Sequence, residues 1–134
     1  MSFSTMVLFG EKSGQPHGNP GSRTLKPGDF VLFDLGVIID GYCSDITRTL
    51  VYQNVSEKQK EIYDTVLQAE TEALKMSKPG VRIGDLDLKA RGIIEKAGYG
   101  DYFPHRLGHG LGISPHEYPS MSHNNDELLK QGMV

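Results

Sequence analysis

The feature that most constrains this chain is a predicted β-hairpin. Its arms are the apolar-rich segments 30–39 and 41–50, and Asp40-Gly41 stands between them. This pair suits a tight two-residue turn, because both central positions of such a turn need φ > 0. The turn makes Ile39 face Tyr42 and thereby determines the pairing of every residue along the two arms.

Each arm of the hairpin carries an aspartate. The predicted register sets Gly36 opposite Asp45, and alternation then places Asp34, Gly36, Asp45 and Thr47 on one face. Asp34 and Asp45 become diagonal neighbours, roughly 7–8 Å apart at the backbone. Two adjacent carboxylates repel unless they share a cation, so the pair indicates half of a metal site. The alternative is an exposed Asp34 and an Asp45 that pairs with Arg48 or caps a turn, and a one-residue bulge would undo the shared face.

The opposite face of the first arm is uniformly apolar. This pattern predicts that the face packs against a core. The residues are Val31, Phe33, Leu35, Val37 and Ile39.

Composition narrows the functional class. The chain has 134 residues, 37% of them hydrophobic, and a formal net charge of −3. This is room for one domain, and neither a basic run for nucleic acid nor an apolar span for a membrane is present. The single cysteine, Cys43, excludes an internal disulfide framework, and we interpret it as a small buried hydrophobe rather than a nucleophile or ligand. A cytoplasmic location is expected.

The first half of the chain also predicts a strand, a loop and a helix. Residues 6–9 indicate a strand, and the Gly- and Pro-rich loop 10–27 carries His17. Ser56 with Gln59 predicts a capping box at a helix N-terminus, and Lys78-Pro79-Gly80 ends that helix. Its predicted apolar stripe is Ile62, Val66, Ala69, Ala73 and Met76.

A second helix is predicted from Gly84 or Asp85 to the C-terminal cap Gly98. Asp85 and Asp87 in its first turn complement the helix dipole, so no chemistry is assigned to them. The inward positions of this helix are predicted to be Leu86, Ala90, Ile93, Ile94 and Ala97.

The last third predicts strand and loop over 102–119, a short helix from Asp126-Glu127, and another strand over 128–134. The fold class is therefore α+β, with an antiparallel sheet and helices on one face.

Three of the five histidines, His105, His109 and His116, fall in the glycine-rich segment 103–119. Neutral imidazole binds Mn²⁺, Co²⁺, Zn²⁺ or Fe²⁺, and flanking glycines let backbone approach a site closely. The spacing is neither that of a zinc finger nor that of a helical His-Glu-x-x-His protease, because Ser120 follows His116-Glu117 where a second histidine would be needed.

These motifs together resemble the creatinase/aminopeptidase P/prolidase family of "pita-bread" metallopeptidases, and within it the Xaa-Pro peptidase branch. The resemblance covers essentially the whole chain and implies a partial pita-bread fold with a curved antiparallel sheet. The segments that carry it are Asp34-Leu35-Gly36, Gly41 to Thr49, Gly108-His109-Gly110-Leu111-Gly112 and Pro115-His116-Glu117-Tyr118-Pro119.

The resemblance implies a two-metal centre with ligands of two Asp, one His and two Glu. Asp34 would chelate one metal, Asp45 would bridge both, and His109 would bind the second. The catalytic histidines implied are His17, His105 and His116, which would contact substrate and stabilise the developing tetrahedral oxygen. Hard carboxylates with one imidazole suit Mn²⁺ best, with Co²⁺ or Zn²⁺ as alternatives.

The family's two glutamate ligands lie on strands beyond Val134, and Glu117 is not one of them. We therefore expect residues 1–134 to be the central part of a catalytic domain, lacking the family's preceding helix and its glutamate-bearing strands. Alone it should bind metal weakly or not at all and be inactive or nearly so. Exposed sheet edges predict a homo-oligomer or aggregation.

The expected partners are proline-containing peptides or dipeptides, with neither nucleic acid nor membrane. Two alternatives stay open: a hydrolase like methionine aminopeptidase, which shares the Asp pair and a Gly-His-Gly motif, and a non-enzymatic pita-bread binding module. Asp34-Leu35-Gly36 and the additional His105 favour the proline-directed branch, and the retained Asp34, Asp45 and His109 count against a binding module.

Overall fold

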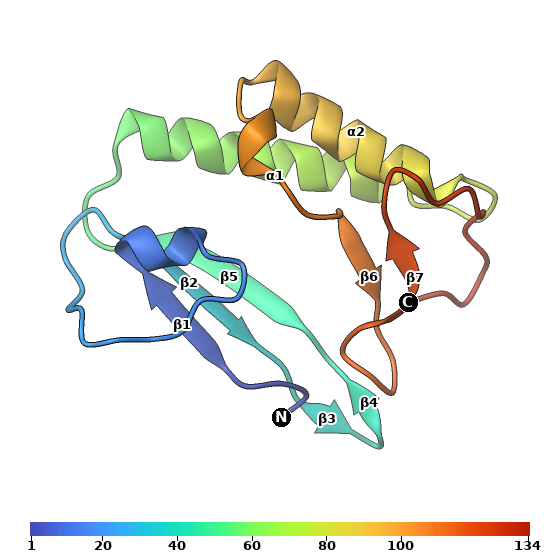
Figure 1. Ribbon diagram of the computed structural model, residues 1–134, viewed down its shortest axis with the longest axis horizontal. Helices are drawn as coiled ribbons and strands as arrows, with labels where there is room; N and C mark the ends of the chain where they lie inside the picture. Colours follow the sequence, from blue (N-terminus) through green and yellow to red (C-terminus); the bar gives the residue numbers. More distant parts are fainter. The chain divides into compact units, whose positions relative to one another are not determined.

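The computed structural model describes residues 1–134, which divide into two compact units. Unit 1 comprises Met1–Gln59 with Leu111–Pro115, and unit 2 comprises Lys60–Gly110 with His116–Val134. Figure 1 shows the elements of each unit. None of the helices is both long enough and apolar enough to cross a membrane.

Unit 1 is built on a three-stranded antiparallel sheet. Its strands are β1 (Met6–Phe9), β2 (Phe30–Leu35) and β5 (Ile46–Val51), in the order β1-β2-β5 (Figure 1). The predicted strand at residues 6–9 is confirmed. So is the predicted hairpin register, because Asp34 pairs with Thr47 and Leu35 with Ile46.

The tip of the hairpin is a separate two-stranded ribbon of β3 (Ile38–Ile39) and β4 (Tyr42–Cys43). Ile39 faces Tyr42, as predicted. Asp40 and Gly41 have φ of 52° and 87°, so both central residues of the turn adopt the left-handed conformation that the sequence pattern requires.

The prediction of two unbroken arms is wrong. Residues 36–37 and 44–45 lie outside the strands, because Ser44 replaces part of the ladder with its side chain. The Val37 N–H donates to Ser44 Oγ at 3.0 Å, whereas the Ser44 N–H donates to the Val37 carbonyl at 2.9 Å. The facing positions are kept, but regular pairing stops on both arms at this point.

The predicted apolar face is buried only at its beginning. Val31 is 9% exposed, whereas Leu35, Val37 and Ile39 are 40%, 45% and 67% exposed. The difference arises because β1 pairs with β2 only as far as Asp34, so the ribbon continues beyond the three-stranded sheet. The self-association inferred from the sequence stays a prediction.

The loop after β1 is more ordered than the sequence indicates. It opens with a 3₁₀ helix, η1 (Gly10–Gly14), and then folds back so that Arg23 meets the buried Asp29 at the start of β2. The Arg23 guanidinium donates to both carboxylate oxygens of Asp29, and the Lys26 N–H donates to Oδ2 at 2.8 Å. These bonds close the loop onto the sheet.

The Arg23–Asp29 pair predicts an acid-sensitive loop. The side-chain hydrogen bond from Arg23 lowers the pKa of the Asp29 carboxyl below the 3.8 that is usual for an aspartate, and the Lys26 N–H adds to this effect against the opposing effect of burial. A carboxyl with a lowered folded-state pKa stabilises the fold above its unfolded pKa. We expect that stability to disappear as the pH falls through the folded-state pKa, below 3.8. Urea unfolding between pH 5 and pH 2 should show that the free energy of unfolding falls less steeply with pH for Asp29→Asn than for the wild type. The same pH dependence in both proteins would contradict this role.

Unit 2 contains two packed helices. Helix α1 (Glu57–Met76) begins with the predicted capping box: the Gln59 N–H donates to Ser56 Oγ at 3.2 Å, and the Ser56 N–H donates to Gln59 Oε1 at 2.9 Å. Ala69 and Ala73 are buried, but Val66 is 52% exposed, so the predicted stripe is correct only in its second half.

Helix α2 (Ile83–Lys96) begins one to two residues before its predicted start. Leu86, Ala90 and Ile94 are buried as expected, whereas Ala97 lies exposed at the C-cap. Ala90 and Ile94 pack with Ala69 and Ala73 of α1 to form the core of the unit. Gly98 has φ of 86°, which confirms the predicted C-terminal cap.

Residues 126–134 form neither the predicted helix nor the predicted strand. Leu128 makes an isolated bridge with Arg82, because the backbone here bonds to the loop between the helices. Gly80 donates to the Leu129 carbonyl at 2.8 Å, and Leu129 donates to the Val81 carbonyl at 2.8 Å.

Candidate metal centre

Asp34 lies in the middle strand of the unit 1 sheet with its carboxylate held in place. Thr47, its direct partner on β5, donates its hydroxyl to Asp34 Oδ1 at 2.9 Å. The contact confirms that Asp34 and Thr47 share a face of the hairpin. It also restricts the orientation of the Asp34 carboxylate.

Asp45 is half-buried and immediately precedes β5, two residues before Thr47. Gly36, across the hairpin, is buried, and a Cβ added there would lie 1.9 Å from the Ser44 carbonyl oxygen. Only glycine allows this close approach of the two arms. The interruption of the ladder therefore includes the position of Asp45, which the register sets diagonal to that of Asp34.

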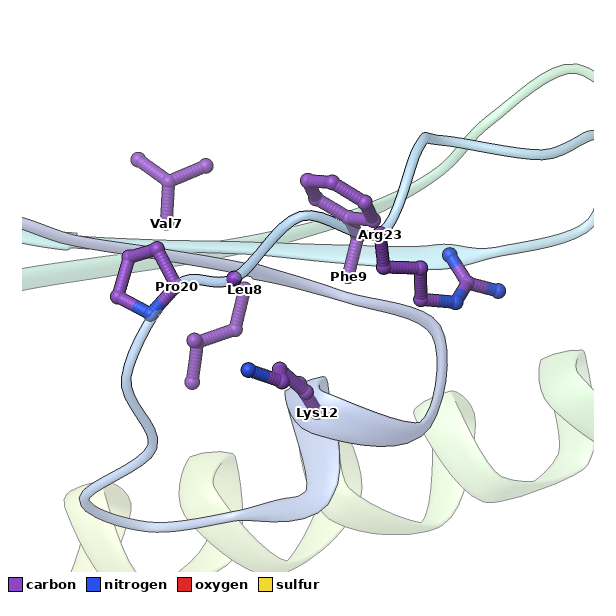
Figure 2. A pocket seen from close by; sticks show the side chains of 7 residues that line it. Val7, Leu8, Phe9, Lys12, Pro20 and Arg23 are labelled. Atoms are coloured by element: carbon purple, nitrogen blue, oxygen red, sulfur yellow. The ribbon is translucent and has the colours of Figure 1, made fainter.

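His17 is exposed on the loop of unit 1, and the two residues that follow it contact other parts of the unit. Gly18 is buried so closely against Leu8 that an added Cβ would lie 2.8 Å from Leu8 Cδ1. Lys12 donates Nζ to the Asn19 carbonyl at 2.8 Å. Figure 2 shows Leu8 and Lys12 together on the side of β1 opposite to Val7 and Phe9. Both residues line a cavity of about 30 Å³. Its other lining residues are Val7, Phe9, Pro20, Gly21 and Arg23.

Unit 2 brings two of the candidate histidines into contact. His109 is half-buried on β6 (Gly108–Gly110), and the exposed His116 directly precedes β7 (Glu117–Met121). Their rings meet edge to face with centroids 4.1 Å apart. His109 Nδ1 lies 3.0 Å from the Gly110 carbonyl, which can only accept, so Nδ1 carries a proton. In the neutral ring Nε2 is then the nitrogen with the lone pair.

A β-bulge sets the direction of the His109 strand. The register of β6 and β7 shifts between His109 and Gly110, and a Cβ on Gly110 would lie 2.3 Å from the Tyr118 carbonyl oxygen. Glycine after His109 is therefore required by close backbone approach, as the sequence pattern indicated.

A cavity of about 380 Å³ in unit 2 includes His109 in its wall. Its surface combines apolar side chains such as Pro119 and Met121 with the lysines Lys78 and Lys130. The remaining lining residues are Ser77, Pro79, Gly110, Leu129, Gln131, Gly132, Met133 and Val134.

His105 lies in the segment without regular structure before β6, and it is exposed. Asp87 anchors this segment by accepting the Leu107 N–H. The sequence pattern predicts only that Asp87 complements the helix dipole, but the residue is completely buried and is paired with Arg91. The Asp-x-x-x-Arg spacing within a predicted helix is the signal that could have identified the pair.

Each unit offers groups whose chemistry suits divalent metal ions. Asp34 and Asp45 of unit 1 carry carboxylate oxygens. His109 of unit 2 has the backbone hydrogen bond that is typical of metal-binding imidazoles. Carboxylate and imidazole suit Mn²⁺, Co²⁺ and Zn²⁺ alike.

Comparison with known proteins agrees with this chemistry. The chain is 81% identical over 134 residues to "Putative dipeptidase YkvY" of Bacillus subtilis, and it spans 37% of that protein's length. A solved prolidase from Thermococcus sibiricus matches 98% of this chain and 36% of its own, with 45% identity and a TM-score of 0.96. An Xaa-Pro dipeptidase from Bacillus anthracis matches 98% of this chain and 37% of its own, with 41% identity and a TM-score of 0.94.

These structural matches confirm the predicted α+β, pita-bread fold. The family model for "Metallopeptidase family M24" covers residues 1–134. The chain therefore belongs to metallopeptidase family M24, as its motifs predicted.

Proposed function

We propose that this chain supplies Asp34, Asp45 and His109 as metal ligands of an Xaa-Pro peptidase with a two-metal centre. The observation that carries the proposal is the His109 ring, whose Nδ1 bonds to the Gly110 carbonyl and whose edge meets His116. Membership of family M24 supports the metal assignment. The similarity to a prolidase and to an Xaa-Pro dipeptidase supports the choice of substrate.

Manganese is the proposed metal, with Co²⁺ or Zn²⁺ as substitutes, because two carboxylates and one imidazole form a predominantly hard donor set. When bound, divalent ions supply a water nucleophile of lowered pKa and positive charge that stabilises the transition state. The chain's own contribution is to hold the ligands: Thr47 orients Asp34, and the Gly110 carbonyl orients His109.

The proposed reaction is hydrolysis of the peptide bond that precedes proline. Water adds to the carbonyl carbon, the C–N bond breaks, and the proline nitrogen takes up a proton. His105 and His116 stabilise the developing oxygen, because imidazole N–H groups are suitable donors to an oxyanion. His17 contacts the substrate.

A peptide panel tests the proposal on the protein expressed at its full genomic length. With Mn²⁺ present, we expect kcat/KM for Ala-Pro and similar dipeptides to exceed that for Met-Ala by at least about tenfold. A chelator should abolish the activity and added Mn²⁺ should restore it. Preference for Met-Ala would favour the methionine aminopeptidase alternative. Absence of hydrolysis with every metal, together with retained peptide binding, would favour a binding module.

A further inference from the structure

Helix α2 carries a buried ion pair close to the histidine segment of unit 2. Asp87 is 0% exposed, and Arg91 one turn later donates Nε to Asp87 Oδ1 at 2.8 Å and Nη2 to Oδ2 at 3.3 Å. A buried charge is retained only with a well-placed partner and additional hydrogen bonds. The remaining contacts of this pair therefore indicate its purpose.

Those contacts go to alternate residues of the segment that carries His105. Arg91 donates Nη1 to the Phe103 carbonyl and Nη2 to the His105 carbonyl, each at 2.8 Å. Asp87 Oδ2 accepts the Leu107 N–H at 2.9 Å, and the same N–H lies 3.0 Å from the Met121 carbonyl. The ion pair thus holds the backbone on both sides of His105, where residues 103–107 form no helix or strand.

The ring of His105 is oriented by the same pair through Phe103. The Arg91 guanidinium lies 4.5 Å above the Phe103 ring, and the edge of that ring meets His105 with centroids 4.7 Å apart. His105 Nδ1 lies 2.8 Å from the Arg106 carbonyl and therefore carries a proton. Backbone and ring of His105 are both tied to Arg91, although the imidazole itself is exposed.

We infer that Arg91, paired with Asp87, is the positioning residue for His105. The inference rests on the proposed function, in which His105 stabilises the developing oxygen. Arg91 is suited to this role because its planar fork reaches two carbonyls and one carboxylate at once, which a lysine ammonium cannot do. Because the oxygen charge develops only in the transition state, the positioning acts on kcat and not on substrate binding.

Arg91→Lys tests the inference in the full-length protein, because it keeps the charge opposite Asp87 and removes the fork. We expect kcat to fall on the order of 10–100-fold, with KM within about twofold of the wild type. The matched control is Arg82→Lys at the N-cap of α2, since Arg82 bonds to Asp85, Asp126 and the His123 carbonyl and to nothing in residues 103–107. It should leave kcat unchanged.

A double-mutant cycle separates positioning from a general structural role. If Arg91 acts through His105, Arg91→Lys should lower kcat no further in a His105→Ala background. Additive losses, a wild-type kcat in Arg91→Lys, or a change confined to KM would overturn the inference. If Arg91→Lys melts below the assay temperature, Phe103→Leu keeps the fork and removes the ring that contacts both residues, and the same coupling to His105 is expected.

A spectroscopic measurement keeps this result independent of the proposed function. In protein with ¹³C-labelled histidine, Arg91→Lys should shift the His105 ring signal, and Arg82→Lys should not. A shifted signal in a protein that cleaves no Xaa-Pro peptide would support positioning and refute the activity. An unshifted signal in an active protein would refute positioning alone.

Discussion

In the full-length protein, Asp45→Asn is expected to lower both Mn²⁺ affinity and kcat/KM for an Xaa-Pro dipeptide by more than about 100-fold. Loss of an outer-shell partner already costs about 10–100-fold at metal sites, and Asp45 is proposed as a direct ligand that bridges both metals. An amide keeps the size of the side chain but removes the negative charge and one of the two oxygen donors.

Asp40→Asn is the matched control, because it makes the same chemical change in the same hairpin. Asp40 is exposed at the turn with φ of 52°, and asparagine before Gly41 suits that conformation equally well. Titration calorimetry with Mn²⁺ and dipeptide hydrolysis should show Asp40→Asn unchanged. Wild-type metal affinity in Asp45→Asn would refute its role as a ligand.

Gly36→Ala is expected to destabilise unit 1 by about 3 kcal/mol or more. Overpacking typically costs about 1–3 kcal/mol, and the cost here is at the upper end or above it because the neighbour is backbone. The new Cβ would lie 1.9 Å from the Ser44 carbonyl oxygen and 2.1 Å from Ser2 Oγ. The two arms would have to separate, and Asp34 and Asp45 would no longer share a fixed face.

Gly92→Ala on α2 provides the opposite expectation for the same substitution. An added Cβ there meets nothing within 4 Å, so the variant should gain roughly 0.5–1 kcal/mol from helix propensity. Urea unfolding of both variants with one protocol tests the contrast. A Gly36→Ala protein as stable as the wild type would show that the close approach at Ser44 is not required.

Sequence patterns predicted the structure correctly wherever a few neighbouring residues determine the backbone conformation. The Asp40-Gly41 turn sets the hairpin register, Ser56 and Gln59 form their capping box, and Gly98 ends α2 in the left-handed conformation. Each depends on backbone geometry within about five residues, which composition and spacing encode directly.

Sequence patterns predicted the wrong structure where a side chain or a distant segment competes for the hydrogen bonds of the backbone. Ser44 turns its hydroxyl to the Val37 N–H and divides the hairpin, a choice that strand propensity does not reveal. Residues 126–134 have the pattern of a helix start and a strand, yet their backbone bonds to the loop between α1 and α2. In the hairpin a serine side chain competes with the backbone of the facing arm, and at residues 126–134 the backbone partners lie far away in the sequence.

By itself, the sequence determined the register that places Asp34 beside Thr47, the glycines that allow close backbone approach, and the motifs of family M24. Only the tertiary structure decided that Asp87 is buried under Arg91 and that this pair holds the segment around His105. The physical reason is burial. A buried ion pair needs a hydrogen-bond partner for each of its donors and acceptors, and those partners lie on a different segment of the chain.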